Sequence, residues 1–178
     1  MQLPGVGLYT GMTILAAIGE IQRFADPGKL VGYSGLGARV HDSGDHYYTG
    51  KIGIVGRSVL RAALIASAWG ALRWSDHWLE LFQPQAKRIG KQKAITAIAR
   101  KLLVVIWQVL TKRELDRNAG TAAIARSFMS WSSAHHLTKV ARQSHLEFVA
   151  QRLELLGILG DVTSFRANGR VHHLGSKP

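Results

Sequence analysis

The sequence has no cysteine, only four prolines and few acidic residues. The absence of cysteine excludes disulfides and thiolate metal sites, which favours a cytoplasmic protein. Pro4-Gly5 interrupts the start and no basic region precedes it, so we predict no signal peptide. The longest aliphatic run, Leu102 to Leu110, is about half of the roughly 20 residues that span a bilayer. We therefore expect no membrane segment.

The scarcity of acidic residues leaves a strongly basic chain. Its 178 residues include 23 Lys and Arg against 11 Asp and Glu, a formal net charge of +12. Such an excess predicts attraction to polyanions, with nucleic acid as the first candidate and an anionic membrane surface as the second. A basic surface without a partner is the alternative, because net charge constrains partners only weakly. The hydrophobic share of 47% is enough for a core.

Apolar residues recur at helical spacing through most of the chain, which predicts an all-α fold. We expect a compact helical domain over residues 1–117 and a looser helical extension with a flexible tail over residues 118–178. Residues 35–56 lack a sustained period and are predicted to be a long loop, with at most a short hairpin in it. The predicted helices cover residues 10–24, 27–33, 57–74, 76–82 (ended by Pro84), 93–110 and a last stretch from about 137.

A glycine turn, Leu3-Pro4-Gly5-Val6-Gly7, stands directly before the first predicted helix. Gly5 and Gly7 would let the backbone approach a phosphate, and the amides of the following helix would point at the anion. This is the hairpin of a helix-hairpin-helix-like element, whose first helix would precede Leu3, so we expect the chain to be part of something longer. The alternative is an ordinary glycine turn before a helix.

Ser43 lies in the segment Asp42-Ser43-Gly44-Asp45, between His41 and His46. A serine hydroxyl becomes a nucleophile when a neighbouring base or cation activates it, and the two histidines are the candidate bases. The alternative is a common polar turn without catalytic function. Candidate phosphate-binding cations near it are Arg39, Lys51, Arg57 and Arg61, the last two one helical turn apart.

A second basic cluster follows later and consists of Lys87, Arg88, Lys91, Lys93, Arg100 and Lys101. It is a candidate nucleic-acid contact, and the alternative is a solvated helix face. The adjacent pairs His135-His136 and His172-His173 do not form a metal site, because adjacent histidines on a helix diverge and no carboxylate stands at ligand spacing. We predict no metal site in this chain.

Taken together, these pieces resemble the C-terminal transposase domain of the insertion-sequence one-ten family, which includes the Piv-type DNA invertases. The resemblance covers roughly residues 3 to 115 and departs at Ala38, Ile54 and Arg57, where the family commonly has Pro, a basic residue and Asn. The matching residues are Leu3–Gly7, Ile18–Ile21, Phe24, Leu30–Leu36, Arg39, Ser43-Gly44, Gly50–Ile52, Gly56, Leu60-Arg61, Lys93–Ile95, Ala99–Leu102 and Trp107.

The resemblance implies a two-part recombinase. Its missing N-terminal part would be a RuvC-like domain whose acidic cluster binds Mg²⁺, and this chain would supply Ser43 as the nucleophile that attacks a DNA phosphodiester. It also implies a guide RNA and a homo-oligomer of the full-length protein. The first alternative is a non-catalytic nucleic-acid-binding module that keeps the glycine turn and the basic helices. The second is an oligomerisation remnant whose charge is incidental.

Overall fold

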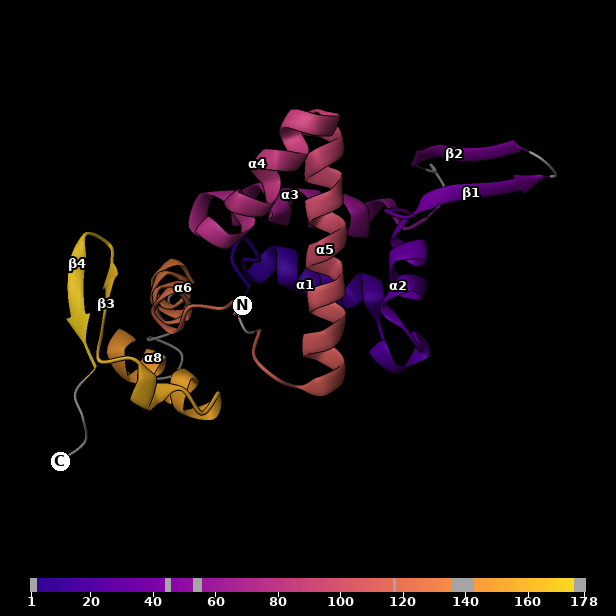
Figure 1. Cartoon of the computed structure of the whole chain (residues 1–178). Helices are drawn as coiled ribbons and strands as arrows, with labels where there is room; N and C mark the ends of the chain where they lie inside the picture. The colour runs from indigo at the N-terminus through magenta and orange to yellow at the C-terminus, as the bar shows by residue number, and fades with distance from the viewer. Residues whose placement is uncertain (1–2, 44–45, 53–55, 117, 136–142, 175–178) are drawn as a thin grey trace. The chain divides into compact units, whose positions relative to one another are not determined.

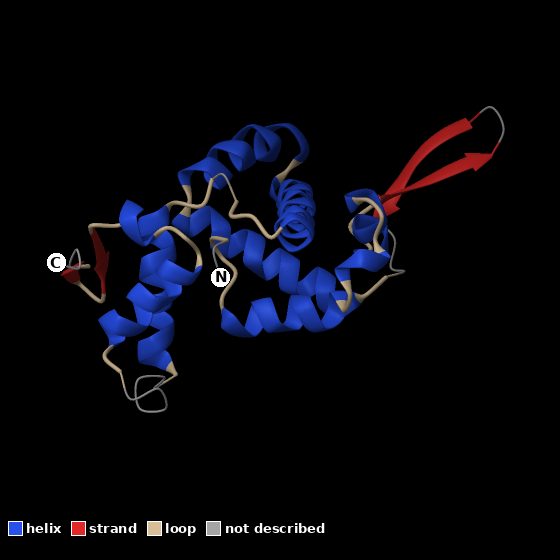
Figure 2. Cartoon of the chain, turned by 90° about the horizontal axis from the view of Figure 1, so that it is seen from below, coloured by secondary structure: helices blue, strands red, loops and turns tan. Residues whose placement is uncertain are grey.

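The computed structural model describes residues 3–43, 46–52, 56–116, 118–135 and 143–174; within residues 38–52 it describes the backbone. The chain divides into two compact units, Gly5–Glu114 and Leu115–Pro178 together with Met1–Pro4. Helices make up most of both units, and each unit also carries one two-stranded antiparallel hairpin (Figure 2). The prediction of an all-α class is confirmed, with these hairpins as small additions.

The first unit is built around one long helix, α5 (Lys91–Lys112), against which α2, α3 and α4 pack (Figure 1). Helix α1 packs on α3 in the same unit. The other elements of the unit are α1 (Leu8–Ile18), the 3-10 turn η1 (Ile21–Arg23), α2 (Pro27–Ser34), β1 (Ala38–Ser43), β2 (His46–Ile52), α3 (Ser58–Trp74) and α4 (Asp76–Ile89).

By length and composition alone, α5 is long and apolar enough to cross a membrane. Its apolar face has another use, because it packs on three neighbouring helices and buries Ile98, Leu102 and Leu103 completely. Trp107, on the same helix, donates its indole N–H to the Phe24 carbonyl over 3.0 Å. These contacts explain the apolar stripe of α5 as the core of the unit.

Two predicted helix boundaries are wrong and one is confirmed. Asp26 caps α2 by accepting the Lys29 amide, with Pro27 at the first helical position, as predicted. The first predicted helix instead ends at Ile18, because Gly19 leaves helical geometry with φ of 64°. Pro84 does not end α4, which continues to Ile89. Packing of α4 on α5 keeps this helix intact through the proline, and the break falls at Gly90, where φ is 83°.

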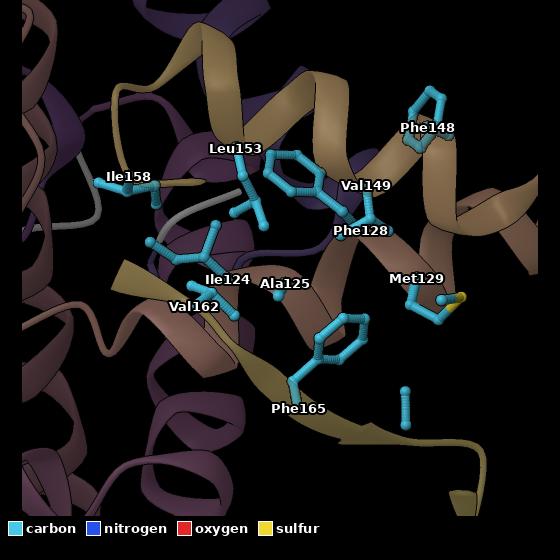
Figure 3. Packing of buried hydrophobic residues seen from close by; sticks show 11 residues of the cluster. Ile124, Ala125, Phe128, Met129, Phe148, Val149, Leu153, Ile158, Val162 and Phe165 are labelled. Carbon is cyan, nitrogen blue, oxygen red and sulfur yellow. The ribbon is translucent and has the colours of Figure 1, made fainter. Parts of the chain in front are cut away.

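The second unit has its own hydrophobic core, in which α6 (Thr121–Ala134), α8 (His145–Leu155) and β3 (Ser164–Ala167) meet. Phe128 from α6, Leu153 from α8 and Phe165 from β3 lie in this core (Figure 3). A short 3-10 turn, η2 (Leu159–Asp161), connects α8 to the hairpin. The unit therefore contains an apolar interior of its own.

The predicted loose tail is folded over residues 164–173. There β3 pairs with β4 (Arg170–His173), and Ala167 stands opposite Arg170. The connection is Asn168-Gly169, with φ of 51° and 75°, the geometry of a two-residue hairpin turn that favours this dipeptide. Phe165 and Ala167 are buried and alternate with exposed residues. The turn dipeptide and this alternation were the signals of a hairpin in the sequence.

Candidate nucleic-acid interface

Ser43 lies on a β-hairpin of the first unit, in a region predicted to be a long loop. Strand β1 pairs antiparallel with β2, and Ser43 is the last residue of β1, opposite His46. Residues 44 and 45, part of the predicted serine turn, lie outside the described residues. Figure 1 shows the two strands leaving the helices beside α2, with β1 pointing away from the helices. The candidate nucleophile is thus at the far end of a hairpin.

The strand register relates Ser43 to both candidate bases. His46 is its direct cross-strand partner, and His41 precedes it by two residues on the same strand, opposite Tyr48. Opposed residues share a face of a sheet, and so do residues two apart on one strand. The backbone therefore places His41, Ser43 and His46 at positions of one hairpin face.

The predicted cations of the hairpin lie toward its other end. The last pair at the base is Ala38 with Ile52, and the register shifts between Ala38 and Val40, so Arg39 falls on the irregular segment. Lys51 is the residue before Ile52. From Ala38 to Ser43 an extended strand runs about 17 Å. Sequence proximity suggested that these cations surround the serine, whereas the register separates them from it along the strand.

The base of the hairpin is fixed by a close approach of two glycines. A Cβ built on Gly56 would lie 2.7 Å from the Gly35 nitrogen, and the φ of Gly56 is 134°. Gly35 itself caps α2 in the left-handed region, with φ of 73°. The next residue, Arg57, donates its amide to the Tyr33 carbonyl over 3.1 Å. The end of α2 and the start of α3 are therefore joined where the hairpin leaves the helices.

Two arginines converge on Tyr33 at this junction. Arg57 donates from Nε to the Tyr33 hydroxyl over 2.8 Å, and that hydroxyl donates to the Ala17 carbonyl over 3.1 Å. The Arg23 guanidinium carbon lies 4.6 Å from the ring centroids of both Phe24 and Tyr33. Both arginines are exposed, and no carboxylate pairs with either within the described part of the chain. We call Arg23, Tyr33 and Arg57 the arginine–tyrosine cluster.

The pKa of Tyr33 reports the field of this cluster. Burial alone raises the pKa of the hydroxyl, but hydrogen bonds and positive charge from Arg23 and Arg57 outweigh it and hold the pKa below its usual 10.0. An anion is therefore favoured beside these groups. Sequence reasoning singled out Arg57 but missed Arg23 and Tyr33, because their meeting depends on the packing of α2 and η1.

The remaining basic residues differ in exposure. Arg61 lies one turn after Arg57 on α3 and is half-buried, with its amide bonded to the Arg57 carbonyl over 3.0 Å. The second basic cluster follows the end of α4 and the start of α5, which meet at Gly90. Its exposed members are Lys87, Arg88, Lys91, Lys93, Arg100 and Lys101. This cluster therefore has no role in the core.

The two glycines of the N-terminal turn have different surroundings. A Cβ on Gly5 would lie 2.2 Å from the Ser67 carbonyl oxygen and 2.3 Å from the Ala71 nitrogen, and its φ is 78°. Gly70 of α3 faces it in turn, its own Cβ position lying 2.9 Å from the Gly5 Cα. The requirement for glycine at position 5 is thus explained by close packing on α3. Gly7, by contrast, is the exposed N-cap of α1, with nothing near its Cβ position.

Metal ligands do not gather in the part of the chain that the structure describes, where no group of three or more His, Cys, Asp or Glu could hold an ion. The family resemblance implies a Mg²⁺ site in an N-terminal domain and none in this chain. The residues of β1 and β2 with functional side chains are Arg39, His41, Asp42, Ser43, His46, Tyr47, Tyr48, Thr49 and Lys51.

Residues 1–83 match the sequence model of a family described as "Transposase IS116/IS110/IS902 family". This stretch holds the glycine turn, the arginine–tyrosine cluster and the whole hairpin with Ser43. This stretch is therefore similar to transposases of that family. The match ends within α4, and residues 115–178 lie outside it. Among solved structures, none matches the chain.

Curated relatives of this chain are named as a transposase and as a protein that inverts a pilin gene. The transposase for insertion sequence element IS1111A of Coxiella burnetii is 32% identical over 122 residues, which cover 65% of this chain and 33% of that protein. The pilin gene-inverting protein of Moraxella bovis is 32% identical over 121 residues, which cover 65% of this chain and 37% of that protein. The chain thus spans about one third of the length of these relatives.

Proposed function

We propose that this chain carries the serine-nucleophile domain of a DNA transposase or site-specific recombinase, with Ser43 as the attacking residue. The observation that carries the proposal is the hairpin register, in which Ser43 and His46 are direct partners and His41 shares their face. The match of residues 1–83 to a transposase family supports DNA as the substrate. The end of a hairpin that extends from the helices is also a position from which a serine can reach a DNA strand.

The proposed step conserves the bond energy of the DNA backbone. The Ser43 hydroxyl gives its proton to His46 or His41 while its oxygen forms a bond to phosphorus. The bond between phosphorus and one nucleoside oxygen breaks, and that oxygen leaves with a proton. The DNA end is then held as a phosphoserine ester, which a second DNA hydroxyl reverses by attack on the same phosphorus.

We propose that the cations at the hairpin base bind the DNA backbone at a position separate from the bond that is cleaved. The arginine–tyrosine cluster presents two guanidinium groups without carboxylate partners among the described residues. Arg39 and Lys51 lie next to the Ala38–Ile52 pair at the base of the hairpin. Gly7, at the exposed start of α1, is a further proposed backbone contact, as is Arg61. For Gly5 the packing on α3 supports a structural role.

Further parts of the machinery are proposed to lie elsewhere. The relatives are about three times as long as the segment they share with this chain, and the described residues offer no metal cluster. We propose that a Mg²⁺ site, a guide RNA and homo-oligomer contacts belong to the full-length assembly, which is cytoplasmic. No step assigned to Ser43 uses a metal ligand from this chain.

The proposal is tested by trapping covalent DNA after adding an N-terminal domain from a relative to this chain. Wild-type protein is expected to form a detergent-stable adduct with labelled DNA, and Ser43→Ala is expected to form none. Ser58→Ala, at the exposed start of α3, is the matched control and should behave as wild type. An adduct of normal yield with Ser43→Ala would eliminate this assignment.

A non-catalytic nucleic-acid-binding module is the second candidate function, favoured by the exposed cations of α4 and α5. It predicts binding without any adduct. Salt-dependent DNA binding by wild type and Ser43→Ala alike, together with no adduct from either, would identify this function.

A further inference from the structure

We propose that Arg23 and Arg57 bind one and the same phosphate group of a DNA strand, and that Tyr33 is the residue that positions them. The choice of DNA as the source of the phosphate rests on the proposed function. The arginine–tyrosine cluster then forms a single phosphate site, because both guanidinium groups meet at one tyrosine.

The two arginines contact different parts of Tyr33. Arg23 lies over the ring, with its guanidinium carbon 4.6 Å from the ring centroid. Arg57 donates from Nε to the hydroxyl over 2.8 Å, and its guanidinium carbon lies 5.9 Å from the same centroid. One tyrosine therefore brings together a guanidinium group from η1 and another from the N-cap of α3.

Tyr33 is itself held by its neighbours in the fold. Its hydroxyl donates to the Ala17 carbonyl of α1 over 3.1 Å, and its ring centroid lies 5.3 Å from that of Phe24. The Phe24 carbonyl in turn accepts the indole N–H of Trp107 from α5. The two rings beneath Arg23 are thus tied to two helices, so a ligand would find the arginines already in place.

The two arginines lack an anionic partner among the described residues. The acidic residues nearest to Arg23 in sequence, Glu20 and Asp26, form no ion pair with it there, and Asp26 accepts the Lys29 amide instead. Arg57 uses its Nε donor on the tyrosine, so the amino groups of its guanidinium remain for a ligand. Two neighbouring positive charges repel each other, and a phosphate bound by both would remove that repulsion.

A phosphodiester has the shape that two convergent guanidinium groups require. It carries two unesterified oxygens, so each guanidinium can donate to one of them. Both arginines are exposed and therefore accessible to a strand. The contact between Gly56 and Gly35 joins this site to the base of the hairpin. A phosphate bound here would fix the register of the DNA strand relative to that hairpin.

The first experiment counts the phosphates that the two arginines bind. The affinity of the full chain for a 20-base-pair duplex is measured by fluorescence anisotropy across a range of salt concentrations. The double variant Arg23→Gln/Arg57→Gln is expected to bind about tenfold more weakly at low salt and to lower the salt slope by about 0.9, the value for one phosphate. A slope lowered by about 1.8 would mean two separate phosphates and would overturn the proposal, as would an unchanged slope.

The second experiment tests the positioning role of Tyr33 with inorganic phosphate. Nitrogen-15 NMR at pH 7 follows the Nε–H signals of Arg23 and Arg57, each assigned by its absence from the corresponding Gln variant. Phosphate should shift both signals more than sodium chloride does at the same ionic strength. Tyr33→Phe keeps the ring but loses the hydroxyl, and it should bind phosphate about tenfold more weakly. Wild-type phosphate affinity in a folded Tyr33→Phe variant would overturn the positioning role.

A measurement on wild-type protein does not depend on how Tyr33→Phe folds. Bound phosphate should raise the pKa of Tyr33, because it offsets the positive charge of Arg23 and Arg57 that lowers it. Arg73→Gln, at an exposed position of α3, is the matched control and should respond to phosphate as wild type does. A pKa of Tyr33 that responds equally to phosphate and to chloride would overturn the proposal.

The source of the phosphate is tested separately from the chemistry of Ser43. If inorganic phosphate shifts the two arginine signals and the DNA duplex does not, the choice of DNA is wrong. Ser43→Ala should leave all of these responses unchanged. Responses to DNA without any covalent adduct would therefore overturn the nucleophile assignment and support the phosphate site.

Discussion

The two hairpins of the molecule differ in what holds them in place. Strand β3 packs on α6 and buries Phe165 and Ala167 in the core of its unit, whereas β1 and β2 make their main contacts with each other. The β3–β4 turn is a tight Asn-Gly pair, while β1–β2 has a register shift near its base and a glycine junction below it. One hairpin is part of a core, and the other extends from helices. The candidate nucleophile lies on the hairpin that packs mainly on itself.

The largest expected difference between the hairpins is in stability. Phe165→Ala removes a buried ring from the core of the second unit and should destabilise that unit by about 3–5 kcal/mol. Ser43→Ala, at the end of β1, should change stability by less than about 0.5 kcal/mol. Hydrogen exchange of peptides from residues 121–173, read by mass spectrometry, measures the first effect. Equal protection in wild type and Phe165→Ala would break the comparison.

A second test compares Gly56, at the junction below the first hairpin, with Gly169, in the turn of the second hairpin. Gly56→Ala brings a methyl group to within 2.7 Å of the Gly35 nitrogen and should cost about 3 kcal/mol. Gly169→Ala, also at positive φ, meets nothing within 4 Å and should cost about 1 kcal/mol for the backbone alone. Urea denaturation of each variant measures the difference. If Gly169→Ala cost as much as Gly56→Ala, the close approach would not be the cause.

The start of α8 should contribute less than either junction. Ser144→Ala removes the side chain that accepts the Glu147 amide and should cost about 1 kcal/mol. Hydrogen bonds from the backbone and side chain of Ser144 lower the pKa of Glu147 below its usual 4.5, outweighing the desolvation that raises it. The stabilising contribution is therefore present above pH 4.5 and is lost as pH falls through the lowered pKa. Thermal melting from pH 6 to pH 3 should show this loss in wild type but not in Glu147→Gln.

The smallest effect concerns the arginine–tyrosine cluster at the base of the first hairpin. Tyr33 should ionise with a pKa below its usual 10.0, seen by ultraviolet absorbance, and Tyr33→Phe should remove this transition. Arg57→Gln should raise the pKa of Tyr33, because it removes a hydrogen bond and a positive charge. Arg73→Gln, on an exposed position of α3, should leave it unchanged. A pKa of Tyr33 that does not respond to Arg57→Gln would show that the cluster does not form in solution.

Much of the helical architecture could be predicted from sequence because it depends on local signals. The cap at Asp26, the stripe of α5 and the span of α3 all follow from residues a few positions apart. Pro84 misled, since α4 is stabilised by packing on α5 rather than by its own sequence. The Asn168-Gly169 dipeptide indicates a hairpin turn in the sequence, but the alternation of buried and exposed residues beside it is short.

The candidate site was only partly predictable. The residues Ser43, His41 and His46 were found from their types and the family resemblance, but their pairing depends on a register that no periodicity revealed. Arg23 in η1 and Tyr33 in α2 are ten positions apart in sequence. Their contact depends on how these two elements fold back on each other. The packing of Gly5 on Gly70 was likewise invisible, because sequence alone cannot distinguish close backbone contact from a phosphate-binding turn.

The length of the first hairpin has a consequence for the spacing of contacts along DNA. Its extended run of about 17 Å corresponds to about five base-pair steps of a duplex, at roughly 3.4 Å each. A backbone contact made at the base and an attack made by Ser43 would therefore fall on different nucleotides, and the strand would act as a ruler between them. If Ser43 attacks DNA as proposed, lengthening both strands by two residues would shift the cleaved bond by about two nucleotides.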